Sequence, residues 1–372
     1  MNGVVDGLPL IDHHCHGVVR DDLSRAGFEA MLTEADASGP LHGSLFDTQI
    51  GMGARAICAP LLELERFAAA DDYLARRADL GWDEVTRRML AGTGIAHYLV
   101  DTGFLADALT TPRELAAYTG ARASEIVRLE TVAEEVLARS EPVGFAAAVR
   151  VALHERAVTA VGFKSVAAYR VGLDLDPERP SDAEVDAAAV EVLRNGTAAR
   201  IAHPTLTRFL IWAALDFGLP LQFHVAYGDS DVDLARCDPL LLTPFLRASS
   251  GLGVPVMLLH NYPFQRSAGY LAQVFDHVFV DVGLTLHNVG VRADAVLAEL
   301  LELAPFGSVL FSSDGFGLPE IYAVNTTLFR RALTAFLDDG IAREYWSTAD
   351  AERVAVMICS GNAERAYRLG AS

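Results

Sequence analysis

The sequence has few cysteines, and no two of them lie close together. The four are Cys15, Cys58, Cys237 and Cys359, scattered over 372 residues without a CxxC spacing. A disulfide scaffold or a thiolate zinc site needs clustered cysteines. The spacing therefore excludes both and predicts reduced thiols, as in a cytoplasmic protein.

Long apolar runs and an excess of positive charge are also missing. No run approaches the roughly 20 apolar residues that cross a bilayer. Asp12, His13, His14 and His16 interrupt the first apolar stretch, so no signal peptide is visible. The net charge of −19 argues against a polyanionic partner, because nucleic-acid binding needs a basic face. We expect a soluble, cytoplasmic protein that binds neither a membrane nor nucleic acid.

What the sequence does have is short apolar runs at regular intervals. Hydrophobic residues make up 51% of the chain and the mean hydropathy is +0.25, which suffices for a large core. Near-continuous apolar runs that alternate with helical segments are typical of parallel strands buried on both faces. Eight such runs span residues 7–12, 95–100, 126–130, 160–166, 219–225, 254–260, 277–282 and 308–314. They predict an α/β protein, a single (β/α)8 TIM barrel over residues 1–372.

The segments between the runs carry helix signals. Ser181 can cap a helix with Glu184 three residues later. One connection, residues 17–94, is far longer than a normal strand-to-helix loop and contains helical stretches. Because such loops surround a barrel's mouth, we interpret residues 17–94 as a helical insertion that caps the site. A surface insertion without a catalytic part is the alternative. Candidate helices span 131–141, 181–196, 204–218, 241–251, 293–304 and parts of 328–371.

The strongest functional signal is the pair of histidines that follows the first predicted strand. Side chains at positions i and i+2 lie on one face of a strand, so His14 and His16 can chelate one ion together. His13 should then face the barrel wall. His224, His260 and Asp314 close three further predicted strands.

Imidazoles and a carboxylate that converge on one mouth form an N/O site suited to zinc, manganese or iron. Taken singly, each of the strand-end side chains could instead bond a neighbouring carbonyl or shape a turn.

Lys164 closes the fourth predicted strand and also needs a partner. Burying an unpaired ammonium is costly. Lys164 could pair with Glu130 or Asp314, bind a substrate carboxylate, or be carboxylated and bridge two metal ions. We rank the ion pair and the substrate contact ahead of carboxylation.

The order of these residues resembles that of the amidohydrolase superfamily. The segments GFKSVAAYRVGL, LQFHVAYGDSDVDL, LLHNYPFQRSAGYLA and SGNAERAYRL are similar to its amidohydrolase-2 branch. They are most similar to the hydrolase-like domain of nodulin and FluG-type glutamine synthetase fusion proteins. The resemblance implies a metal held by His14, His16 and Asp314, with His224 joining them. One ion is favoured, zinc first and manganese or iron as alternatives; two ions would need a carboxylated Lys164.

The resemblance implies hydrolysis of an amide C–N bond in a small carboxylate-bearing substrate, such as a γ-glutamyl amide. A bound divalent cation lowers the pKa of water from 15.7 towards about 7. Asp314 would accept the proton, and His260 would orient water or move protons. Arg170 is the candidate for binding the substrate carboxylate, a surface ion pair being its alternative. Weaker candidates for the pocket wall are Arg266, Tyr262, Glu130 and His287.

Other functions remain compatible with the same residues. A decarboxylase, an isomerase or a lactonase could use the same metal site. A catalytically silent barrel that only binds a ligand is the third class. The sequence leaves homo-oligomerisation open.

Overall fold

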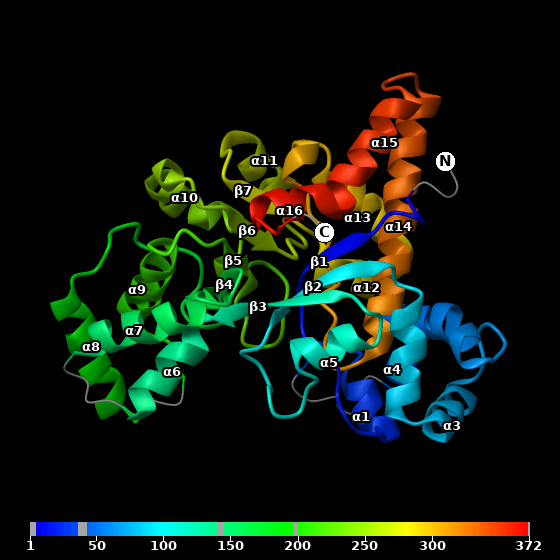
Figure 1. Ribbon diagram of the computed structural model, residues 1–372, viewed down its shortest axis with the longest axis horizontal. Helices are drawn as coiled ribbons and strands as arrows, with labels where there is room; N and C mark the ends of the chain where they lie inside the picture. The colour runs from blue at the N-terminus through cyan, green and yellow to red at the C-terminus, as the bar shows by residue number, and fades with distance from the viewer. Residues whose placement is uncertain (1–4, 36–42, 140–143, 197–199, 371–372) are drawn as a thin grey trace.

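Seven parallel strands form one curled sheet in the computed structural model, which is described over residues 5–35, 43–139, 144–196 and 200–370. The strands follow one another in chain order, and every neighbouring pair is parallel. Helices connect them and cover the outside of the sheet (Figure 1). This confirms the α/β class and the parallel sheet. The strands are β1 (Leu10–Cys15), β2 (Ile95–Asp101), β3 (Arg122–Arg128), β4 (Gly162–Ser165), β5 (Leu221–His224), β6 (Val256–Leu259) and β7 (Val278–Val280).

The eighth predicted strand is an extended segment that bonds to both edges of the sheet without forming a regular strand. On one side, the backbone N–H of Leu310 donates to the carbonyl of Val280 at 3.0 Å. On the other, Asp314 N–H donates to the carbonyl of His14 at 3.1 Å. The expectation of eight regular strands is therefore wrong by one. The ladder is interrupted because Asp314 has a φ of 47° and because Ser313 N–H donates to the Asp12 carboxylate instead.

The helices agree with the predicted ones in position. The Ser181–Glu184 capping box is present: Ser181 N–H donates to the Glu184 carboxylate at 2.8 Å. The predicted helix 131–141 runs into residues 140–143, which lie outside the described residues. Outside the long β1–β2 connection, the helices are α5 (Pro112–Ala117), α6 (Leu129–Arg139), α7 (Phe145–Ala157), α8 (Asp182–Arg194), α9 (Pro204–Leu215), α10 (Thr243–Ser249), α11 (Gln265–Val274), α12 (Gly283–Val289), α13 (Ala293–Leu300), α14 (Pro319–Ala342), α15 (Thr348–Val356) and α16 (Asn362–Ala366).

The connection between β1 and β2 contains α1 (Arg25–Ala30), α2 (Gln49–Gly53), α3 (Ala70–Leu80) and α4 (Trp82–Ala91). Its aromatic and aliphatic side chains form a hydrophobic cluster with the start of α14. Glu320 of α14 anchors it, accepting hydrogen bonds from Tyr73 Oη at 3.0 Å and Arg77 Nε at 2.8 Å. The division into one barrel domain with an insertion at 17–94 stays a prediction.

A further apolar cluster fills the inside of the curled sheet. It takes side chains from five strands and the segment after β7, with α16 and Tyr367 completing it. Because Ile11 of β1 belongs to this cluster, His14 and His16 lie beyond it, towards the C-terminal ends of the strands. The clustered residues are Ile11, Leu99, Ile126, Met257, Leu259, Phe279, Leu310, Ala363, Ala366 and Tyr367.

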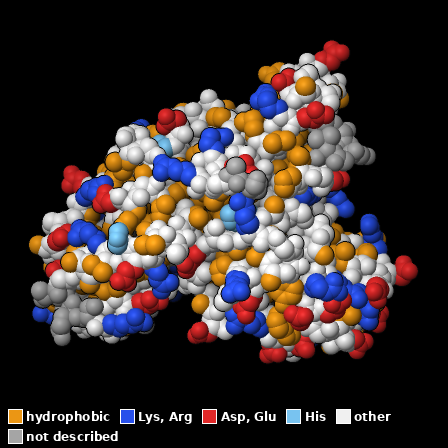
Figure 2. Space-filling view, viewed as in Figure 1, with side chains coloured by type: hydrophobic (Ala, Val, Ile, Leu, Met, Phe, Trp, Pro, Cys, Tyr) orange, Lys and Arg blue, Asp and Glu red, His pale blue; other side chains and the backbone are white. Residues whose placement is uncertain are grey.

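The surface mixes charges of both signs. Figure 2 shows acidic and basic side chains interspersed on one face, with a notch at the lower edge between the α6–α8 region and the segment that joins β2 to α5 (Figure 1). Among the described residues, none of the helices combines the length and apolarity that crossing a bilayer requires.

Candidate metal site

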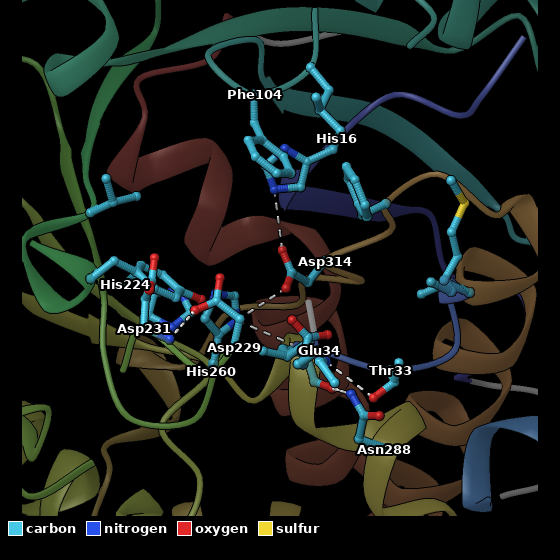
Figure 3. Close-up of a pocket in the computed structure, with 18 of the residues that line it drawn as sticks. His16, Thr33, Glu34, Phe104, His224, Asp229, Asp231, His260, Asn288 and Asp314 are labelled. Carbon is cyan, nitrogen blue, oxygen red and sulfur yellow. Dashed lines mark hydrogen bonds and ion pairs between the residues drawn. The ribbon is translucent and has the colours of Figure 1, made fainter. Parts of the chain in front are cut away.

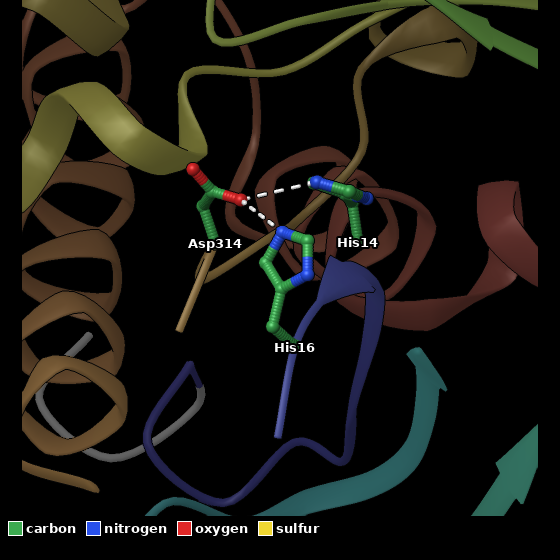
Figure 4. Close-up of side chains that lie close together, drawn as sticks. All are labelled: His14, His16 and Asp314. Atoms are coloured by element: carbon green, nitrogen blue, oxygen red, sulfur yellow. Dashed lines mark ion pairs between the residues drawn. The ribbon is translucent and has the colours of Figure 1, made fainter. Parts of the chain in front are cut away.

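Three side chains from the two ends of the chain meet at the C-terminal ends of the strands. His14 Nε2 lies 3.1 Å from Asp314 Oδ1, and His16 Nε2 lies 3.7 Å from the same oxygen (Figure 4). One donor atom from each of the three residues lies within 4.8 Å of those of the other two. The sequence-predicted ligands His14, His16 and Asp314 are thus brought together around one point.

The chemistry of these three groups fits a divalent cation. His16 Nδ1 lies 3.2 Å from the carbonyl oxygen of Asp101, which can only accept, so Nδ1 carries the hydrogen. The lone pair of His16 is then on Nε2, which faces Asp314. Burial lowers the pKa of both His14 and His16, which keeps the imidazoles neutral, as ligands must be. Two imidazole nitrogens and a carboxylate oxygen are a donor set that zinc prefers.

Lys164 lies against this group of donors. Its Nζ is 2.8 Å from His14 Nε2 and 3.7 Å from Asp101 Oδ2. The Arg128 guanidinium forms an ion pair with the same carboxylate, with 2.6 Å between Arg128 Nη2 and Asp101 Oδ2. Burial lowers the pKa of Lys164, although Asp101 opposes this. Burial alone would raise the pKa of Asp101, but Arg128 and Lys164 outweigh it and the pKa falls.

Of the two carboxylates expected as partners of Lys164, Glu130 instead accepts a hydrogen bond from Ser165, and neither it nor Asp314 forms an ion pair with Lys164 among the described residues. Asp101 takes that place, and sequence reasoning missed both Asp101 and Arg128. These residues end β2 and β3, so the rule that singled out the other strand ends would have found them.

His260 and His224 line the next part of the site. His260 Nδ1 is 3.8 Å from Asp314 Oδ2. The imidazole rings of His224 and His260 lie 4.7 Å apart between their centroids. His224 Nε2 lies 3.0 Å from the carbonyl oxygen of Tyr227. Burial lowers the pKa of His224 to about 3 and lowers that of His260 as well. His224 is close to the three clustered donors but is not one of them.

Asp314 is ionised at neutral pH. Burial by itself raises the pKa of its carboxyl, but His260, His16 and Lys164 outweigh this, and the pKa is about 2. The site therefore holds an anion among neutral imidazoles beside one buried lysine.

The backbone around these side chains is strained. His260, Asn261 and Asp314 have φ angles of 72°, 60° and 47°, in the left-handed region that non-glycine residues rarely occupy. Buried hydrogen bonds hold the turn after β6: Thr285 Oγ1 donates to the His260 carbonyl at 2.9 Å, and His260 N–H donates to Asp281 Oδ1 at 3.0 Å. Strain of this kind concentrates at functional sites.

His13 belongs to a buried network rather than to the cavity. Its Nε2 lies 2.9 Å from Asp281 Oδ2, and its Nδ1 lies 3.0 Å from Tyr367 Oη. Gln222 Nε2 donates to Tyr367 Oη at 2.8 Å. The histidine directly before the first predicted ligand therefore ties β1 to β7, β5 and the end of α16.

The clustered donors open into a cavity of about 620 Å³. Figure 3 shows Asp314 between His16 and His260, with Glu34 and Asp229 near it. Arg170 lines this cavity and forms an ion pair with Glu134, with 3.3 Å between Nη2 and Oε1. The wall is mixed in character: Arg128, Lys164, Arg170, Arg200 and His287 are cationic or imidazole groups, Glu34, Asp229 and Asp231 are acids, and Phe104, Leu284, Phe316 and Ile321 are apolar.

Three weaker candidates lie elsewhere. Arg266 is exposed on α11 and pairs with Glu302 at 2.7 Å, because the first turn of α11 directs it outward. Glu130 is fully buried and accepts from Ser165 Oγ at 2.8 Å. Tyr262 lines a second cavity. Arg266, Glu130 and Tyr262 therefore do not line the first cavity, and their roles in substrate binding stay predictions.

A curled parallel sheet with imidazole and carboxylate donors at its C-terminal mouth is a metal-dependent hydrolase-like fold. The chain is similar to a protein from Lactobacillus casei ATCC 334 provisionally described as a metal-dependent hydrolase. The two are 31% identical, with a TM-score of 0.86, and the match covers 98% of this chain and 96% of that one. The chain belongs to the amidohydrolase superfamily, in its amidohydrolase-2 branch.

More distant similarities agree with this fold. Uronate isomerases from Bacillus halodurans C-125 and Thermotoga maritima are 14% and 11% identical, with TM-scores of 0.62 and 0.64, over 99% and 98% of this chain and 95% of each of theirs. Protein fluG of Emericella nidulans is 28% identical over 97% of this chain. The chain spans about half the length of that curated relative, 46%. No protein-family model matches the chain.

Proposed function

We propose that the protein is a metal-dependent hydrolase that cleaves an amide C–N bond in a small carboxylate-bearing substrate. The observation that carries the proposal is the meeting of His14, His16 and Asp314, whose donor atoms lie within 4.8 Å of one another at a cavity. A γ-glutamyl amide is the substrate that we propose first, since fluG-type relatives are associated with glutamine synthetase. Arg170 and Lys164 in the lining of the cavity support a substrate that carries a carboxylate.

His14, His16 and Asp314 would hold one divalent cation, zinc first. A cation there would supply Lewis acidity and a hydroxide nucleophile at neutral pH. The ligand role of His224 remains part of the proposal, since its ring adjoins that of His260.

Asp314 would move the proton. Its Oδ1 faces His14 and His16, which leaves Oδ2 towards His260. Because Asp314 is ionised at neutral pH, Oδ2 can accept a proton from the attacking water and later deliver it to the leaving amine. His260 Nδ1, at 3.8 Å from Oδ2, would orient that water.

The cationic side of the cavity would bind the substrate carboxylate. Arg170 and Lys164 both line it, and each already has a carboxylate near it, Glu134 and Asp101 respectively. Arg170 therefore has to share its guanidinium between Glu134 and the substrate. Its planar, forked geometry permits this, because two of its N–H edges can serve different carboxylates.

The test is metal analysis followed by product analysis. Protein purified without chelators is incubated with γ-glutamyl methylamide, a simple lactone and a hexuronate, and the products are identified by mass spectrometry. We expect glutamate and methylamine, and we expect His14→Ala to lose both the bound metal and the turnover. The control is His154→Ala, which removes an exposed histidine of α7.

Retention of metal and activity by the His14 variant would contradict the site. Isomerised hexuronate without amide cleavage would favour an isomerase instead, the activity that the names of the fold neighbours carry.

A further inference from the structure

A second cavity of about 670 Å³ adjoins the first. Four residues line both cavities: Leu32, Thr33, Ile50 and Asn288. Figure 3 shows Thr33 and Asn288 together at one end of the first cavity. The two cavities therefore adjoin along these four residues. Each has a volume within the range that small-molecule sites occupy.

The second cavity differs in chemistry from the first. Ile50, Val289 and Val296 supply apolar surface, and the Tyr227 and Tyr262 side chains add aromatic surface. The second cavity has no histidine in its lining and none of the clustered metal donors. A ligand there would be bound rather than cleaved.

The charges of the second cavity favour an anion. Glu299 lines it but is already paired with Arg266, at 3.1 Å between Oε1 and Nη2. Arg292 is exposed at its edge, and among the residues that the structure describes it has no ion-pair partner. A ligand with an apolar body and a carboxylate would match this combination.

Helix α12 connects the two cavities. Leu284 and His287 face the first cavity, and Thr285 lines the second. Thr285 Oγ1 also donates to the carbonyl of His260 at 2.9 Å. The second cavity thus lies one helix away from the reacting groups, close enough for one molecule to reach both.

We propose that the second cavity binds the leaving-group end of the substrate, an amine with an apolar body and a carboxylate. The inference rests on the proposed function, in which the amide bond lies beside Asp314. The acyl end then occupies the Arg170 side of the first cavity. The amine end passes the Thr33–Asn288 boundary, and its carboxylate meets Arg292. The substrate class is an amide of an aromatic or long-chain amino acid.

The experiment compares three amides that differ by one feature each. γ-Glutamyl methylamide has a small leaving group, γ-glutamyl anilide adds the ring, and 4-(γ-glutamylamino)benzoate adds the carboxylate. Binding of free 4-aminobenzoate to the metal-loaded protein is measured separately by calorimetry, so that the second cavity is tested even if no amide is cleaved.

Two variants alter the second cavity and leave the first intact. Arg292→Ala should raise KM for 4-(γ-glutamylamino)benzoate and weaken 4-aminobenzoate binding by about five- to tenfold, the usual effect of one exposed charged hydrogen bond. It should leave the anilide within about twofold. Ala295→Trp narrows the cavity and should impair both aryl amides but not the methylamide. The control is Arg247→Ala, which removes an exposed arginine of α10.

The outcomes separate the two proposals. If no amide is cleaved but 4-aminobenzoate still binds and its binding depends on Arg292, the proposed hydrolase function is rejected. The second cavity then stands as a binding site. Unchanged KM values and unchanged 4-aminobenzoate binding in both variants would overturn the second cavity as a substrate site. Stimulation of methylamide turnover by bound 4-aminobenzoate would also overturn it and would indicate a separate effector site, because a ligand in the leaving-group site should inhibit.

Discussion

The carboxylate of Asp281 accepts the backbone N–H of His260, with 3.0 Å between Oδ1 and the nitrogen. The same oxygen accepts the N–H of Gly283 at 2.7 Å, and Oδ2 faces His13 Nε2 at 2.9 Å. All of these groups are buried. One side chain from the end of β7 thereby fixes the strained backbone of a residue that faces Asp314.

We predict that Asp281→Ala destabilises the protein by about 3–5 kcal/mol, because several buried donors lose their acceptor together. Turnover should fall as well, since His260 is no longer held. Urea unfolding and steady-state kinetics measure the two effects. Asp281→Asn keeps an oxygen for His260 and should lose less of both; equal losses in the two variants would count against this role.

We predict that zinc raises the melting temperature of the metal-free protein. A ligand that binds only the folded state stabilises it by mass action, about 2.7 kcal/mol at a free concentration of 100 times Kd. Asp314→Ala should abolish the shift, measured by differential scanning fluorimetry. His287→Ala, which alters the cavity wall outside the clustered donors, should retain it. A full shift in the Asp314 variant would place the metal elsewhere.

We predict that Glu320→Ala opens the β1–β2 connection. Arg77 would remain buried without its carboxylate, at a cost of about 3–5 kcal/mol. Hydrogen exchange should rise first in residues 43–91, before the strands. The exposed pair of Arg343 and Asp339 gives the control, because Asp339→Ala should cost less than about 1 kcal/mol. Uniform exchange over the whole chain would show that the connection is not a separate unit.

We predict that His97 makes the protein less stable in acid. Burial, aided by Arg122, lowers the pKa of His97 from 6.5 to about 4. Between these values the unfolded chain binds more protons than the folded one, so stability is complete above pH 6.5 and falls towards pH 4. His97→Gln should reduce that fall by about 2–3 kcal/mol at pH 4, measured by urea unfolding. The same pH dependence in the variant would assign the effect to other groups.

The parts of the fold that sequence predicts well are those set by local pattern. The apolar runs located the seven strands, and Ser181 with Glu184 marked a helix start, because burial and capping depend on neighbouring residues. The irregular form of the last predicted strand was harder to predict, because the hydrogen bond between Ser313 N–H and the Asp12 carboxylate joins distant parts of the chain.

The candidate site shows the same division. Their position at the ends of predicted strands was enough to group His14, His16 and Asp314 in one predicted site. The same criterion would have added Asp101 and Arg128. The expectation that Arg266 lines the cavity failed, because the first turn of the helix after β6 directs its side chain to the surface. The partner of His13, Tyr367, lies near the other end of the sequence, and no local pattern points to that contact.

The hydrogen bond from Asp314 N–H to the His14 carbonyl joins the first and last parts of the sheet, and their side chains are the proposed ligands. A cation bound there would act as a non-covalent cross-link between positions 300 residues apart in the sequence, from 14 to 314. Its loss would loosen the seam between the first and last segments, and the opening of that seam would set how quickly the apoprotein unfolds.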